Sequence, residues 1–268
     1  MKKLLVFICL GVLSAFASIG QELYSRVKIY GTDEQLNQAA QMGVTLDHGQ
    51  HKRDLWFITD LSESEIQILE NNGFTYEILI EDVSAYYVAN SNAEVESSDN
   101  HRSGCGSSGS GDSFNVSDPA NWQLGSMAGF YTYQEFLDEL DSMASKYPNI
   151  ISVKSPISTF TSIEGRPILW VRMSDNPNSD EAEEEVLYTS LHHAREPASL
   201  SQLIFYMWWM LENYGINDEV TYLIDETEMY FVPMINPDGY VYNETTNPGG
   251  GGMHRKNRRN VGTSNKGV

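Results

Sequence analysis

Hydrophobic and polar positions between residues 22 and 90 follow two periods in turn, which predicts a compact α+β unit. Period-two alternation, as in YSRVKIY, is typical of strands, and the predicted strands lie at 24–30, 44–46, 54–59 and 76–81. Two helices are predicted, each from a capping box to a glycine: Thr32-x-x-Gln35 to Gly43, and Ser62-x-x-Glu65 to Gly73. The order β-α-β-β-α-β is ferredoxin-like. No catalytic residue types cluster here, so we interpret this unit (21–90) as a folding or covering module.

Residues 91–120 are rich in Ser, Gly, Asn and Asp, and this change predicts a linker. Such a composition buries too little apolar surface to fold on its own. Exposed flexible segments are where proteolytic cutting concentrates, so we expect the first cuts between Ser91 and Asp118.

The remaining chain, 121–268, alternates longer strand and helix patterns. One helix is predicted to open on Thr132-x-x-Glu135 and to be stopped by Pro148. A second has Pro197 in its first turn and Gly215 past its end, and a shorter one covers 217–225. The predicted strands lie at 150–157, 167–173, 185–191 and 228–235. This alternation predicts an α/β fold with a mixed, largely parallel and mostly buried sheet flanked by helices.

The first twenty residues predict a secretory signal peptide, 1–20. Lys2 and Lys3 precede an apolar stretch too short to span a bilayer, and Ala15-Phe16-Ala17 forms a small-x-small cleavage site. A second cleavage position follows Gly20. We therefore expect a secreted protein, extracellular or periplasmic, with no membrane span after signal removal.

Charge and cysteine content narrow the function classes. The 268 residues carry a net charge of −20, which argues against binding to nucleic acid because its phosphates need a basic surface.

Of the two cysteines, Cys9 would leave with the signal peptide, so Cys105 either pairs outside this chain or is a free thiol. The sequence shown therefore contains no disulfide framework.

The candidate chemistry lies in LHHAREP, directly after the predicted strand 185–191. His193 and Glu196 can point the same way across a turn, and ligands bind at this edge of open α/β sheets. One imidazole nitrogen and one carboxylate would make up two of the three protein ligands of a catalytic zinc site. The purely structural alternative for H-x-x-E is a helix-capping glutamate beside a surface histidine. HExxH and its inverted form are both absent.

Four motifs occur in a specific order: SIEGRPI, HAREP, FVPMINPDGY and MHRKNRRN. Together they resemble the zinc carboxypeptidase family, the carboxypeptidase A, B and T group, over residues 129–268. The unit before them looks like that family's activation segment, so the chain resembles a secreted bacterial-type precursor, a zymogen. The resemblance implies Zn²⁺ as cofactor and a metallocarboxypeptidase that removes C-terminal amino acids from a peptide or protein substrate.

The resemblance also implies roles for four residues. His193 and Glu196 match the first two zinc ligands, and Arg195 matches a residue that helps line the substrate cleft. Arg255 matches the arginine that polarises the scissile carbonyl and stabilises the oxyanion, and it binds substrate in the same cleft. The alternative for its RKNRR segment is a solvated basic loop, but a basic cluster in so acidic a chain favours an anion-facing site.

Two of the motifs match structural turns instead of catalytic groups. Gly165 in EGRPI and Gly239 in NPDG serve backbone geometry, and Asp238 is expected to be a turn acceptor and not an acid.

The family's remaining site residues have no match, because the chain stops at TSNKGV. These are the Asn-Arg pair that holds the substrate carboxylate, the third zinc ligand, the cleft tyrosine and the general-base glutamate. The remaining histidines offer no convincing substitute: His48, His51, His101, His192 and His254. We therefore expect an N-terminal fragment, inactive by itself. Two alternatives stay open, namely an inactive peptidase-fold binding protein and a related zinc hydrolase of cell-wall peptides.

Overall fold

The computed structural model describes residues 23–95 and 117–260. The predicted signal peptide, most of the predicted linker and Cys105 lie outside the described residues. The boundaries assigned to the four segments remain a prediction. No helix among the described residues has the length and apolar character needed to cross a membrane.

The N-terminal unit contains an antiparallel sheet in the order β2-β3-β1-β4. Its elements follow the predicted β-α-β-β-α-β order, and both predicted capping boxes are present. The two helices and the sheet enclose one apolar core that includes Val27, Ile29 and Leu69. The bounds are β1 Tyr24–Tyr30, α1 Asp33–Gln41, β2 Gln50–Lys52, β3 Trp56–Ser62, α2 Glu63–Asn71, β4 Thr75–Ile80 and α3 Val83–Val95.

One expectation for this unit is wrong, and one helix was not predicted. The short strand lies at Gln50–Lys52 and not at 44–46, because Val44 takes part in the C-terminal cap of α1: its amide donates to the carbonyl of Ala39. Helix α3 was not predicted, and it extends into the segment assigned to the linker. Its apolar residues do not follow a helical period that would place them on one face, because Tyr86, Tyr87 and Val88 are consecutive and all exposed.

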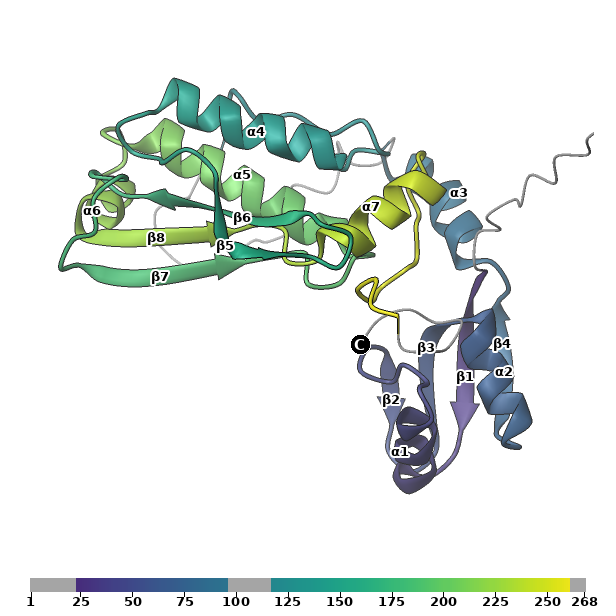
Figure 1. The fold of residues 1–268 in the computed structure, drawn as a ribbon. Helices are drawn as coiled ribbons and strands as arrows, with labels where there is room; N and C mark the ends of the chain where they lie inside the picture. Colours follow the sequence, from purple (N-terminus) through teal and green to yellow (C-terminus); the bar gives the residue numbers. More distant parts are fainter. Residues whose placement is uncertain (1–22, 96–116, 261–268) are drawn as a thin grey trace, which may run out of the picture.

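The C-terminal half is built on a second sheet in the order β5-β6-β8-β7. Helices α4 and α5 lie on one side of it (Figure 1), and side chains such as Phe136, Ile204 and Phe231 fill the core between them. Helix α4 begins at the predicted capping box of Thr132. The bounds are α4 Tyr133–Lys146, β5 Ser155–Thr161, β6 Pro167–Met173, β7 Glu184–Thr189, α5 Pro197–Asn213, α6 Asp218–Glu226, β8 Thr227–Val232 and α7 Pro237–Thr246.

This sheet is mixed, as predicted, but its described part is not largely parallel. Only β7 and β8 pair in parallel, whereas β5–β6 and β6–β8 are antiparallel. The first strand starts at Ser155 and not at 150, and Ile151 forms only an isolated bridge. Strand β7 is the edge strand of the described sheet, so Val186 and Leu187 are exposed where a buried strand was expected.

Helix α7 replaces a predicted turn at NPDG. Asn236 is its N-cap, and the side-chain oxygen accepts the amide hydrogen of Gly239 at 3.1 Å. Pro237 occupies the first helical position, where a missing amide hydrogen costs nothing. The N-terminal unit lies beyond the carboxyl ends of β7 and β8, beside α7 and the segment that follows it (Figure 1).

Candidate active site

The loop between β7 and α5 carries the predicted ligands, and its backbone is strained at its start. Leu191 has a φ of 48°, a left-handed conformation that is unfavourable for a bulky side chain. Hydrogen bonds hold it there, because its amide donates to Ser199 Oγ at 3.0 Å and its carbonyl accepts from the Asn236 amide at 3.1 Å. The strand therefore turns sharply just before His193.

His193 and Glu196 meet across this turn. Nδ1 of His193 lies 3.0 Å from each carboxylate oxygen of Glu196. Glu196 occupies the N-cap position of α5, yet its side chain makes no capping hydrogen bond. The structure thus rules out a helix-capping glutamate as the explanation of H-x-x-E. Both side chains remain about one-third exposed, at 35% and 38%, so the pair can be reached from outside.

Arg255 joins this pair from a segment 62 positions further along the chain. Its Nη2 lies 3.3 Å from His193 Nδ1 and 2.7 Å from Oδ2 of Asp47 in the N-terminal unit. The Arg255 side chain is only 11% exposed, and its Nε is buried without a hydrogen-bond partner among the described residues. A largely buried guanidinium therefore stands beside two potential metal ligands.

Arg195 points elsewhere. Its Nη1 lies 3.5 Å from the carbonyl oxygen of Asp60 in the N-terminal unit, a long contact. The structure thus brings His193, Glu196 and Arg255 together, whereas Arg195 faces β3. The substrate-cleft role of Arg195 remains a prediction.

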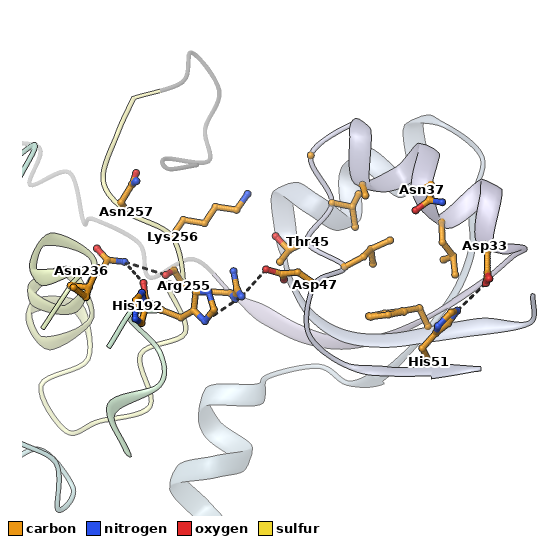
Figure 2. A pocket seen from close by; sticks show the side chains of 18 residues that line it. Asp33, Asn37, Thr45, Asp47, His51, His192, Asn236, Arg255, Lys256 and Asn257 are labelled. Carbon is orange, nitrogen blue, oxygen red and sulfur yellow. Dashed lines mark hydrogen bonds and ion pairs between the residues drawn. The ribbon is translucent and has the colours of Figure 1, made fainter. Parts of the chain in front are cut away.

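A cleft of about 880 Å³ lies between the two halves of the chain. Figure 2 shows Arg255 reaching across it to Asp47, with His51 held by Asp33 on the far wall. His192 and His193 line the near wall. The candidate site thus opens into this cleft even with the N-terminal unit in place.

Asp238 is a hydrogen-bond acceptor, but it joins two motifs from the first turn of α7 and does not serve the predicted NPDG turn. It accepts hydrogen bonds from Ser162 Oγ at 2.7 Å, the Glu164 amide at 2.8 Å and Arg166 Nη1 at 2.8 Å. Burial alone would raise the pKa of Asp238, but these hydrogen bonds and the Arg166 cation hold it below its usual value. The EGRPI turn is thereby fixed to the start of α7.

Three residues at this site were missed by the sequence interpretation: Asp47, Asn236 and Asn243. Asp47 belongs to a loop with no catalytic signature, and Asn236 was included only as part of a turn. Asn243 is buried, and its side chain bonds to the backbone of both Ala194 and His254. No local sequence signal marks Asn243, because both its burial and the helix that carries it become visible only in the structure.

The comparisons with known proteins agree with these observations. Residues 136–268 match the family model described as zinc carboxypeptidase. This half of the chain belongs to the zinc carboxypeptidase family, as the motifs predicted. Membership in this family of hydrolases implies Zn²⁺ as the cofactor.

Two curated relatives and one solved structure illustrate the similarity. A zinc carboxypeptidase of Saccharothrix mutabilis subsp. capreolus is 33% identical over 131 residues, 49% of this chain and 29% of that protein. Inactive metallocarboxypeptidase ECM14 of Saccharomyces cerevisiae is 31% identical over 104 residues, 38% of this chain and 24% of that protein. The crystal structure of carboxypeptidase A from Helicoverpa armigera superimposes with a TM-score of 0.59 at 18% identity, covering 91% of this chain and 55% of that one.

The structural superposition bears on the fold of the chain, and the coverage bears on how much of each relative the chain matches. The solved structure confirms the mixed α/β fold over most of the described chain. The chain spans 29% and 24% of the length of the two relatives, so it matches only part of each.

The residues present fit part of a zinc site. One imidazole nitrogen and one carboxylate 3.0 Å apart, both about one-third exposed, are a donor set that zinc uses. Among the described residues, the groups of three potential ligands are acidic side chains around Asp175 and Glu228, and neither includes His193 or Glu196. The described residues therefore account for two protein ligands of a zinc ion, His193 and Glu196.

Proposed function

We propose that this chain contributes to a secreted, zinc-dependent metallocarboxypeptidase that releases C-terminal amino acids from peptides. One observation carries the proposal: His193 and Glu196 turn toward each other beside Arg255, and Glu196 leaves its helix uncapped to do so. Because Glu196 is not committed to capping α5, its carboxylate is available as a ligand beside His193. Family membership supports the same reaction class.

His193 and Glu196 would hold the zinc. When bound, zinc supplies a water acidic enough to act as nucleophile near neutral pH. Arg255 presents a fixed cation where negative charge develops on the scissile carbonyl oxygen. Because its side chain is largely buried, little solvent screens that charge. The third ligand and the general base lie outside the set that these described residues provide.

We also propose that the N-terminal unit is an activation segment that covers this site. Oδ2 of Asp47 pairs with Nη2 of Arg255 at 2.7 Å, and the carbonyl of Asp60 lies near Arg195. A substrate carboxylate or carbonyl oxygen would need the same donors. Removal of the unit after cutting in the linker would therefore release the two arginines for substrate.

The test measures the peptidase activity of the full-length protein. We expect chelator-sensitive release of the last residue from peptides with an unmodified C-terminus, and no cleavage of the same peptides carrying a C-terminal amide. Glu196→Gln should lower zinc affinity and abolish turnover. Turnover that survives chelation, or equal cleavage of amidated peptides, contradicts the proposal.

For the 268-residue chain alone, we expect weak zinc binding and no peptide hydrolysis. Two protein ligands leave the ion largely hydrated, whereas a catalytic site uses three. Isothermal titration with zinc and a peptidase assay measure both. Clear, chelator-sensitive turnover by this chain would contradict the ligand assignment.

A second candidate is a peptidase-fold protein without catalysis. The similarity to a metallocarboxypeptidase named as inactive favours it. The complete protein would then bind zinc or peptide without turnover. Cleavage restricted to cell-wall peptides would instead support the related zinc hydrolase.

A further inference from the structure

The proposed zinc ligands and Arg255 lie on two loops, and no strand pairing between residues 23–95 or 117–260 joins them. The first loop follows β7 and the second follows α7. One backbone hydrogen bond connects them directly, from the Ala194 amide to the Arg255 carbonyl at 3.0 Å. Arg255 Nη2 also approaches His193 Nδ1 at 3.3 Å, and the side chain of Asn236 donates to the carbonyls of His192 and Arg255 at 3.4 Å each. These three contacts are long, so shorter bonds are needed to fix the spacing of the loops.

The side-chain amide of Asn243, in the middle of α7, bonds to both loops. Its Nδ2 donates to the carbonyl of Ala194 at 3.0 Å and to the carbonyl of His254 at 2.7 Å. Its Oδ1 accepts the amide hydrogen of His254 at 2.9 Å. The side chain is 4% exposed, so water competes little for these bonds. One residue thus holds the neighbour of His193 and the neighbour of Arg255.

The rest of α7 is shaped for this close approach. A Cβ at Gly239 would lie 2.6 Å from the Lys256 carbonyl oxygen and 2.8 Å from Ala194 Cβ, so only glycine lets the helix touch both loops. A Cβ at Gly252 would lie 2.6 Å from Asn243 Cβ, so the chain returning toward Arg255 passes directly over the amide. Helix α7 is therefore packed against both loops along its length.

Asparagine is chemically specific at this position. Two carbonyls need donors and one amide hydrogen needs an acceptor, and the carboxamide supplies two N–H groups and one oxygen. Aspartate has the same shape but offers no donor when ionised, and it would place negative charge against two carbonyl oxygens. An apolar side chain would leave all three backbone groups without their partner, which is costly in a buried site.

We propose that Asn243 is a positioning residue that sets the Arg255 loop against the zinc-ligand loop. This inference rests on the proposed function for its catalytic consequence, but the clamp itself is a property of the fold. The hydrogen bonds of the Asn243 side chain go to the backbone of Ala194 and His254, so Asn243 acts through these two neighbours of His193 and Arg255.

The first experiment follows amide hydrogen exchange in the 268-residue chain and needs no activity. Asn243→Asp should speed exchange of the Ala194 and His254 amides together, by about tenfold or more, while amides in the middle of α5 keep their protection. Gly252→Ala displaces the same side chain without removing it, and should loosen the same two amides. Asn213→Ala is the matched control: its side-chain amide donates to the carbonyl of Trp209 in its own helix at 2.8 Å, and neither loop should respond.

The second experiment uses the complete, active protein. Asn243→Asp should lower kcat by about 10–10²-fold with KM changed less than about twofold, because small misplacements of a catalytic group cost this much in rate. In the Arg255→Ala background the same substitution should cost almost nothing further, since it acts through that arginine.

The outcomes separate the clamp from the reaction. Faster exchange at His254 with Ala194 unchanged would overturn the clamp, as would full additivity of Asn243→Asp with Arg255→Ala. If the unsubstituted protein shows no peptidase activity, the proposed function fails, and coupled exchange at the two loops still decides the clamp.

Discussion

His254 should make the protein lose stability as the pH falls below about 6.5. The ring is buried, packs edge-on against Tyr242 with 4.9 Å between ring centroids, and has an Nε2 without a partner in the described part of the chain. Burial, followed by repulsion from the Arg258 cation, lowers the pKa of His254 to about 4. The folded protein therefore keeps this imidazole neutral where the unfolded chain would protonate it.

The sign and size of the effect follow from that difference. Above pH 6.5 both states are neutral, and the contribution to stability is complete. Between pH 6.5 and 4 only the unfolded state binds the proton, so the free energy of unfolding falls with pH. Since one pKa unit corresponds to about 1.4 kcal/mol, the loss reaches about 3 kcal/mol at pH 4.

The test compares the unsubstituted chain with His254→Phe, which keeps an aromatic ring against Tyr242 and cannot be protonated. Urea unfolding followed by tryptophan fluorescence at pH 7, 6, 5 and 4 gives the free energy of unfolding for each protein. Carboxylates also titrate in this range, but they contribute equally to both curves and cancel in the difference. The difference should move by about 3 kcal/mol in favour of the variant between pH 7 and 4. Parallel curves would refute the reasoning.

Three further outcomes are expected. Arg255→Ala in the complete protein should lower kcat by about 10²–10³-fold with little change in KM, and an effect on KM alone would reassign it to carboxylate binding. Arg172→Met should cost about 3–5 kcal/mol in urea unfolding, because Glu228 is fully buried and would lose its ion-pair partner at 2.9 Å; a loss below about 1 kcal/mol would contradict this. Limited proteolysis should cut first between 91 and 118, and primary cleavage within 22–90 would count against the linker.

Local signals predicted the helices and strands that depend on local chemistry. The capping boxes at Thr32, Ser62 and Thr132 are all present, because each is satisfied by atoms three residues away. Helix α7 was missed because its proline and glycine suggest a turn, whereas in the structure both belong to the first turn of the helix. Pro237 starts the helix, and Gly239 admits two neighbouring loops. A glycine kept for a tertiary contact has the same local sequence signature as one kept for a turn.

Strand direction and the partners within the site depend on contacts between distant segments. The parallel pairing of β7 with β8 and the antiparallel pairing of β6 with β8 leave no mark in either strand alone. His193 and Glu196 could be placed together because one turn connects them. The approach of Arg255 depends on α7, and the contact with Asp47 depends on how two separately folded units meet.

The ion pair between Asp47 and Arg255 has a consequence for how substrate would compete. Because one chain carries both partners, Asp47 acts at an effective concentration on the order of millimolar, whatever the protein concentration. Asp47 is 55% exposed, so added salt would weaken its hold. A single cut between the two units turns the contact into an association between separate molecules. At micromolar protein the effective concentration of Asp47 then falls about a thousandfold. A peptide at ordinary assay concentrations then competes successfully with Asp47 for Arg255.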